Sequence, residues 1–105
     1  MKYQVKATPR ALWELAQFAE SANAYGAMWA RTQSARLERA ILTEIAGAPH
    51  QWSYFYLTGA PYRAYLFRAG REIQYWIVYS VDDAAQTVNI LRFWNASRDP
   101  DRFRL

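Results

Sequence analysis

The residues best suited to binding or catalysis are arginines that alternate with aromatic residues in the second half of the chain. Arg63 and Arg68 flank one strand-like run, and Arg98 follows the apolar run VNILRFW, which Arg92 interrupts. The aromatic residues among them are Tyr62, Tyr65, Trp76 and Trp94. Guanidinium groups beside exposed rings can hold phosphates and stack on bases, and they also bind carboxylates. The pattern therefore predicts a surface that binds an acidic partner, either nucleic acid or protein.

Arg92 has two possible roles, because a charged side chain within an apolar strand is unfavourable unless it is exposed or paired. We expect Arg92 to be exposed and to form a target-binding surface with Arg98, Arg63, Trp94 and Asn95. One alternative is that most of the rings belong to the core while Arg92 merely points to solvent. Another is that Arg92 is a buried ion-pair partner, for example of an aspartate. Stability distinguishes a buried Arg92 from an exposed one, since loss of one member of a buried pair destabilises by about 3–5 kcal/mol.

Conventional catalytic and cofactor sites are not expected. His50 is the single histidine and the chain has no cysteine, so neither a thiolate site nor a histidine cluster is available for a metal. Asp82-Asp83 stands in a turn-like stretch, where aspartate is favoured for its turn geometry. The four glycines are scattered and form no phosphate-binding loop. We therefore predict no metal and no cofactor, and we assign no catalytic residue.

The first half of the chain predicts one strand and two helices. Residues 2–7 alternate in polarity, as in a half-buried strand. Thr8-Pro9 is typical of a helix start, and residues 9–23 follow with apolar side chains at helical spacing. A stop at 23–26 precedes a second helix over about 27–46, whose apolar seam is Ala30, Ser34, Leu37, Ile41 and Ile45, with Leu42 beside it. The short break implies an antiparallel helical hairpin.

After Pro49 the apolar period changes from 3.6 to 2, which predicts strands over residues 52–57, 63–68, 72–81 and 87–94. Short turn-like links make neighbouring strands an antiparallel meander. The expected fold is α+β, with an N-terminal strand, a two-helix hairpin and then a three- to four-stranded antiparallel meander. The residues expected in its core are Leu12, Leu15, Leu37, Ile41, Ile45, Ile77, Tyr79 and Ile90.

Length and composition indicate one domain over residues 1–105. The tail from about residue 97 is polar, and we expect it to be loose. The net charge of +4 comes from eleven arginines and two lysines against nine acidic residues. The N-terminus has no apolar run of the kind found in signal peptides, and no stretch approaches a membrane span. These features, with the lack of cysteine, favour the cytoplasm and exclude a membrane partner.

The C-terminal half carries two informative segments, residues 75–82 (YWIVYSVD) and 88–100 (VNILRFWNASRDP). In these segments the chain resembles the RelE/ParE superfamily of bacterial toxins. Members commonly carry a tyrosine–arginine–isoleucine–x–tyrosine strand, then an isoleucine–leucine–arginine–valine strand leading to histidine–glycine–alanine–arginine–aspartate–proline. The family implies a small antiparallel sheet with two helices on one side. It also implies a growth-inhibiting toxin held inactive by an antitoxin whose disordered segment wraps it, with the oligomeric state left open.

Two departures from the family pattern favour one branch over the other. RelE-like toxins cut messenger RNA, usually in the ribosome, whereas ParE-like toxins poison DNA gyrase. Trp76 and Asn95 stand where many RNA-cleaving members have arginine and histidine, and neither can supply the charge or the proton that cleavage requires. Some RNA-cleaving members use lysines and arginines instead, and Lys2, Lys6, Arg63, Arg92 and Arg98 could serve in this way. The ParE-like branch is favoured, with a ribosome-dependent endoribonuclease and an inactive antitoxin-binding relative as the alternatives.

Overall fold

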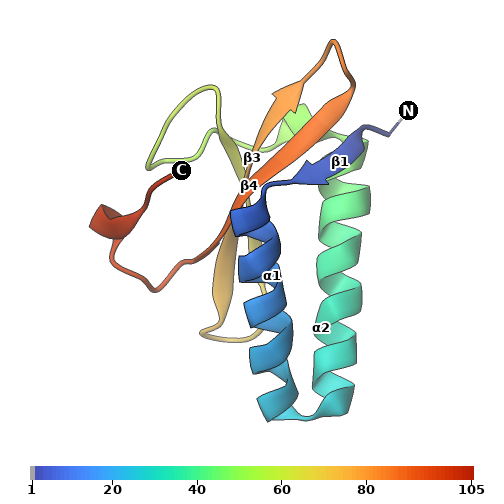
Figure 1. Cartoon of the computed structure of the whole chain (residues 1–105), viewed down its shortest axis with the longest axis vertical. Helices are drawn as coiled ribbons and strands as arrows, with labels where there is room; N and C mark the ends of the chain where they lie inside the picture. Colours follow the sequence, from blue (N-terminus) through green and yellow to red (C-terminus); the bar gives the residue numbers. More distant parts are fainter. Residues whose placement is uncertain (1) are drawn as a thin grey trace.

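The computed structural model describes residues 2–105 as a two-layer α+β domain. A four-stranded sheet has the order β1-β4-β3-β2, and two helices lie side by side against one of its faces (Figure 1). The strands are β1 (Gln4–Ala7), β2 (Arg63–Arg68), β3 (Gln74–Asp82) and β4 (Thr87–Asn95). Strands β2, β3 and β4 form an antiparallel meander, whereas β1 pairs with β4 in parallel. The α+β class is thus confirmed, but the sheet is mixed rather than a simple antiparallel meander.

Helix α1 (Pro9–Ala22) begins as predicted. The Thr8 side chain accepts a hydrogen bond of 3.1 Å from the Ala11 N–H, and Pro9 occupies the first turn, where its missing N–H has no consequence. A short 3₁₀ turn (η1, Asn23–Tyr25) and Gly26, with φ of 105°, reverse the chain. Helix α2 (Ala27–Arg39) then runs back beside α1 (Figure 1), which confirms the helical hairpin.

The face that α1 buries differs from the prediction. Ala11, Phe18 and Ala22 are buried, Leu15 is partly buried, and Leu12 is 56% exposed. The expectation that Leu12 is a core residue is therefore wrong. The Phe18 ring makes edge-on contacts with Phe67, Tyr75 and Phe93 of the sheet, with centroid separations of 5.1–6.0 Å. This large aromatic contact orients α1, so that the neighbouring stripe of smaller apolar residues faces outward.

The second helix continues as a π-helix (η2, Ala40–Ile45), in which the Ala46 N–H bonds to the carbonyl of Ile41 five residues back. The wider turn brings Ile45 onto the same buried face as Ala40 and Leu37. The predicted seam is therefore right at Ala30, Leu37 and Ile45, and partly right at Ile41. It is wrong at Ser34, which is exposed, while the neighbouring Gln33 is buried.

Residues 52–57 do not form the predicted strand. They make one isolated bridge, between Tyr54 and Arg63, and then curl into a loop closed by backbone hydrogen bonds between Phe55 and Tyr62 and between Gly59 and Phe55. This loop inserts Phe55, only 1% exposed, against the face of the sheet opposite the helices. The Phe55 ring packs against Trp76 and Phe103, with centroid separations of 5.5 and 5.1 Å, and the burial of this ring stabilises the loop in place of the predicted strand.

The two faces of the sheet carry separate cores. The helix-side core includes Ile77, Tyr79, Ile90 and Phe93, and a second cluster on the other face contains Phe55, Ala64, Val78, Trp94 and Phe103. Phe103 comes from the C-terminal tail, which folds back through a short 3₁₀ turn (η4, Pro100–Arg102) and packs against Trp94 and Phe55. The expectation of a loose tail is wrong, because the buried phenyl ring fixes it to the sheet.

Candidate binding groove at the end of the central strand

The candidate site lies where strand β1 ends and its neighbour β4 continues alone. Beyond Ala7, the edge of β4 is covered by the first turns of α1 instead of by a strand. The Thr8 hydroxyl donates to the Leu91 carbonyl at 3.1 Å, and the Phe93 N–H donates to the Glu14 carboxylate at 3.0 Å. Side chains of α1 thus replace the missing strand, and the C-terminal half of β4 faces the helix across a groove.

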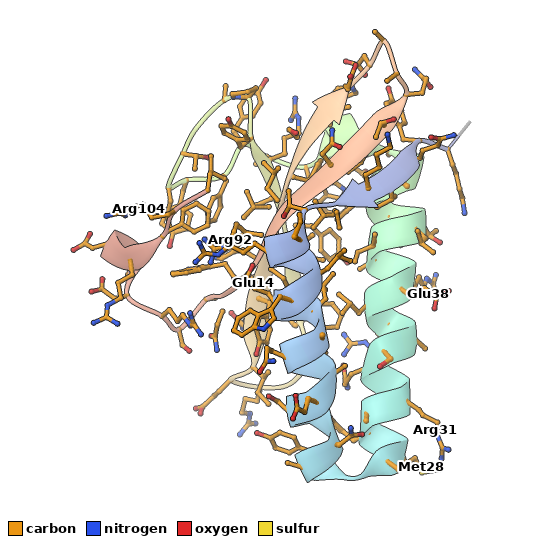
Figure 2. The ribbon with its side chains drawn as sticks, in the orientation of Figure 1. Glu14, Met28, Arg31, Glu38, Arg92 and Arg104 are labelled. Carbon is orange, nitrogen blue, oxygen red and sulfur yellow. The ribbon has the colours of Figure 1, made fainter. Side chains whose placement is uncertain are left out.

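Arg92 is buried, contrary to our expectation that it is exposed. Its relative exposure is 0%, and its Nε and second guanidinium nitrogen donate to the two carboxylate oxygens of Glu14 at 2.9 and 2.8 Å. Its remaining guanidinium nitrogen donates to the main-chain carbonyl of Arg104 in the tail. Figure 2 shows Arg92 between Glu14 on α1 and the C-terminal segment that carries Arg104. The pairing alternative is therefore the one observed, with glutamate rather than aspartate as the partner.

A β-bulge explains why Arg92 faces the tail. Val78 pairs with Arg92 but Tyr79 pairs with Ile90, so Leu91 is an extra residue in β4. Strict alternation would place Arg92 on the same face as Ile90, in the helix-side core. The bulge reverses the alternation, so Phe93 joins that core and Arg92 turns to the opposite face.

Trp94 and Arg63 also make contacts within the fold and do not form an exposed binding surface. Trp94 is only 3% exposed, and the guanidinium groups of Arg92 and Arg98 lie 5.0 and 5.5 Å from the centre of its ring. Arg63 is partly buried, donates to the Trp52 carbonyl at 2.6 Å and stacks on the Tyr54 ring at 4.3 Å. Its position on β2 also separates it from Arg98 by the width of two strands. The structure therefore does not bring all five predicted residues together on one exposed surface.

Asn95 and Arg98 do meet, at one groove. We call it the β4-end groove; its volume is about 210 Å³, and it is lined by Trp13, Glu14, Gln17, Phe18, Ser21, Tyr75, Phe93, Asn95 and Arg98. Asn95 shapes it, because its side-chain oxygen accepts from the backbone N–H and the hydroxyl of Ser97, at 2.9 and 2.7 Å, in the turn that leads to Arg98. Trp13 is 62% exposed and forms an apolar wall.

Arg98 also lines a second, more open hollow of about 570 Å³, which we call the arginine hollow. Arg10, at the start of α1, and Arg102, in the tail, contribute two further exposed guanidinium groups, and Asp99 is the one acidic residue in its lining. The Asp99 carboxylate is engaged by the Asp101 N–H at 3.0 Å. The arrangement gives the end of β4 an excess of positive charge suited to carboxylate or phosphate groups.

Several of these residues were missed by the sequence analysis. Trp13 lies next to Leu12 in a stretch that resembles a buried helical face, and Arg10 and Arg102 lie 92 positions apart in the chain. No spacing rule connects such positions. Tyr75 is the first residue of the segment 75–82 that carries the family resemblance, and no other pattern pointed to it. Its ring stacks on Phe93 at 4.3 Å, and burial raises the pKa of its hydroxyl while nearby Arg98 opposes the rise. Tyr75 therefore stays a neutral hydrogen-bond donor at the groove.

A separate polar cluster joins Tyr3, His50 and Asp83. One oxygen of the Asp83 carboxylate accepts from the Tyr3 hydroxyl at 2.7 Å and lies 2.8 Å from His50 Nε2. These contacts lower the pKa of Asp83, the Tyr3 hydrogen bond most and the His50 hydrogen bond next. The cluster lies at the β3–β4 turn, whereas Arg98 follows the other end of β4, about 25 Å away along the strand. His50 therefore cannot act as an acid or base beside Arg98.

Fold and site together define a two-layer α+β domain with a basic, aromatic-lined groove at the end of β4, one of the two inner strands. Among residues 2–105, no three His, Cys, Asp or Glu side chains are grouped so that they could hold a metal ion. In the same range, no helix combines the length and apolarity needed to cross a membrane. No protein-family model matches the chain, and no curated protein matches it by sequence.

Proposed function

We propose that this protein is a growth-inhibiting toxin of the RelE/ParE type, which acts by binding its target and is neutralised by a cognate antitoxin. The order of elements supports the family assignment. An N-terminal strand, a helical hairpin on one face of the sheet and a three-stranded meander follow one another as the resemblance implies. Residues 75–100, which carry the resemblance, form β3, β4 and the turn that bears Arg98.

The burial of Arg92 is the observation that favours binding over RNA cleavage. Cleavage by the 2′-hydroxyl needs a base, an acid and a cation around one phosphate. Arg92 is held by Glu14, Arg63 is held by the Trp52 carbonyl, and His50 is at the far end of the sheet. Arg98 remains as an exposed cation beside Asn95 and Tyr75, which suits recognition of an acidic protein surface. A replication protein such as DNA gyrase is the proposed target.

The arginine hollow is the one observation that favours the alternative, a ribosome-dependent messenger RNA endoribonuclease. Arg10, Arg98 and Arg102 could hold a phosphate backbone. Tyr75 is the only titratable hydroxyl in the adjoining groove, and its raised pKa keeps this hydroxyl protonated near neutral pH, so it is not available as the base. An inactive relative that only binds antitoxin is a third possibility, and no structural feature favours it.

The test is induced expression in bacteria with two separate measurements, a DNA-damage reporter and the decay of messenger RNA. We expect growth arrest with induction of the DNA-damage reporter and unchanged decay of messenger RNA. Rapid decay of messenger RNA without the reporter signal would assign the chain to the endoribonuclease branch. Normal growth, with the folded protein present at high level, would reject the toxin proposal. Co-expression with the product of a neighbouring short reading frame should restore growth.

A further inference from the structure

Strand β2 is one edge of the sheet, and part of its outer backbone is unpaired. The Ala64 N–H points away from β3 and donates to the Ser53 carbonyl at 3.1 Å. Because strand residues alternate in direction, Leu66 and Arg68 also point their backbone groups outward. Neither N–H has a backbone partner outside the sheet among residues 2–105. Such an edge can pair with another extended chain.

Two hollows flank this free edge, one on each face of the sheet, and both include Tyr65, Leu66 and Arg68. The hollow on the helix side is about 350 Å³ and is bounded by Arg36, Arg39 and Glu44. The hollow on the opposite face is also about 350 Å³ and is bounded by Trp52, Ser53 and Trp76. An added strand sends successive side chains to opposite faces, so alternate side chains would enter the two hollows.

The two hollows differ in chemistry. Arg36, Arg39 and Glu44 bound the helix-side hollow alone, whereas Arg68 lines both hollows. No ion pair within residues 2–105 neutralises any of these three arginines. The Arg36 guanidinium is also preorganised, because it donates to the Gln33 side chain at 2.7 Å and lies 5.5 Å from the centre of the Phe67 ring.

The opposite hollow presents the Trp76 ring and the Leu66 side chain. Trp52 lies at its rim, because the Trp52 ring packs against Tyr65 and donates to the Glu44 carbonyl on the helix side. Acidic side chains therefore suit one hollow and apolar side chains suit the other.

We propose that an extended segment of another protein, with alternating acidic and apolar residues, adds to the sheet along β2. Its backbone pairs with Leu66 and Arg68, its carboxylates bind Arg36 and Arg39, and its apolar side chains contact Trp76 and the Leu66 side chain. Assignment of this segment to the antitoxin rests on the proposed function; the docking surface itself does not. A second copy of the chain is disfavoured as the occupant, because it would bring a further set of arginines to the same edge.

The test uses capped octapeptides and the full chain, with binding measured by calorimetry at low and physiological salt. The first peptide alternates glutamate with valine. One control alternates lysine with valine, and another has the composition of the first peptide with its four glutamates preceding its four valines. We expect the first peptide to bind at least about tenfold more tightly than either control. On its addition, amide hydrogen exchange at Leu66 and Arg68 should slow.

The variant Arg36→Glu/Arg39→Glu should weaken binding of the alternating acidic peptide at least about tenfold. The matched control is Arg31→Glu/Arg71→Glu, which makes the same change of charge at exposed positions outside both hollows and should retain binding. Arg31 lies near the N-terminal end of α2, away from Arg36 and Arg39 (Figure 2). Equal binding of the three peptides, or equal effects of the two double variants, would overturn the proposal. Dimerisation that protects Leu66 without peptide would also overturn it, in favour of a second copy.

Growth inhibition by the unmodified chain, measured in parallel, separates this proposal from the proposed function. Growth arrest without peptide binding would reject the β2 docking surface and leave the toxin proposal intact. Peptide binding by a chain that does not inhibit growth would support the docking surface and reject the toxin proposal.

Discussion

The carboxylate of Glu14 and the guanidinium of Arg92, 78 positions apart, form a buried pair joined by two hydrogen bonds of 2.9 and 2.8 Å. Their side chains are 10% and 1% exposed. The same carboxylate accepts from the Phe93 N–H, and the same guanidinium donates to the Arg104 carbonyl. The pair therefore connects α1, strand β4 and the C-terminal tail.

Loss of Arg92 should be strongly destabilising. Arg92→Met leaves the Glu14 charge buried without its partner, and we expect a loss of about 3–5 kcal/mol in the free energy of unfolding. Chemical denaturation measures this loss, and the melting temperature should fall by more than about 12 °C. The double variant Arg92→Met/Glu14→Gln removes both charges while keeping an oxygen for the Phe93 N–H, so it should recover part of the loss. Unchanged stability of Arg92→Met would show that the pair is not buried in solution.

The docked tail should contribute measurable stability through Phe103. This ring is 7% exposed and contacts Phe55 and Trp94, with centroid separations of 5.1 and 5.2 Å. We expect Phe103→Ala to lower the free energy of unfolding by about 3 kcal/mol and to make the tail sensitive to proteolysis. Leu105→Ala is the control, because Leu105 is 51% exposed. A tail that is cleaved equally fast in both variants would mean that Phe103 does not anchor it.

Arg98 should matter for activity more than for stability. It is exposed and its guanidinium lies over the Trp94 ring, so Arg98→Ala should lower the free energy of unfolding by less than about 1 kcal/mol. Under the proposed function the same variant should inhibit growth much less than the unmodified chain at equal expression. Arg71→Ala, in an exposed turn outside the groove, should retain full inhibition. Full inhibition by Arg98→Ala would place the target-binding surface elsewhere.

The Asp83 cluster predicts a dependence of stability on pH. Its hydrogen bonds lower the pKa of Asp83 below the ordinary value of 3.8, so the folded state binds this proton less readily than the unfolded state. The stabilisation is complete above pH 3.8 and is lost as the pH falls through the lower, folded-state pKa. Melting temperatures between pH 2 and 7 should therefore show Asp83→Asn below the unmodified chain at neutral pH, with the difference vanishing in acid. A difference that is constant across this range would contradict the prediction.

Asp101→Asn serves as the matched control, because it makes the same change of charge at another exposed carboxylate. The Asp101 carboxylate makes no hydrogen bond among residues 2–105. We therefore expect Asp101→Asn to keep the melting temperature of the unmodified chain at neutral pH.

The sequence alone determined the elements whose signals are local. Thr8-Pro9 and Gly26 mark the helix limits through capping and backbone geometry, and the period of two after Pro49 reveals three of the four predicted strands. It also grouped Asn95 and Arg98, which both line the β4-end groove because one ends β4 and the other follows it closely; their binding of a target stays a prediction.

Only the tertiary structure decided which side chains face which layer. The bulge at Leu91 reverses the alternation in β4 and turns Arg92 toward the tail, where Glu14 neutralises it. The Phe18 contacts rotate α1 so that Leu12 is exposed, and the Phe103 ring fixes a tail whose other residues are mostly polar. Each outcome depends on partners far away in the chain. Local periodicity cannot predict such partners, because packing and charge pairing depend on contacts between the helices, the sheet and the tail.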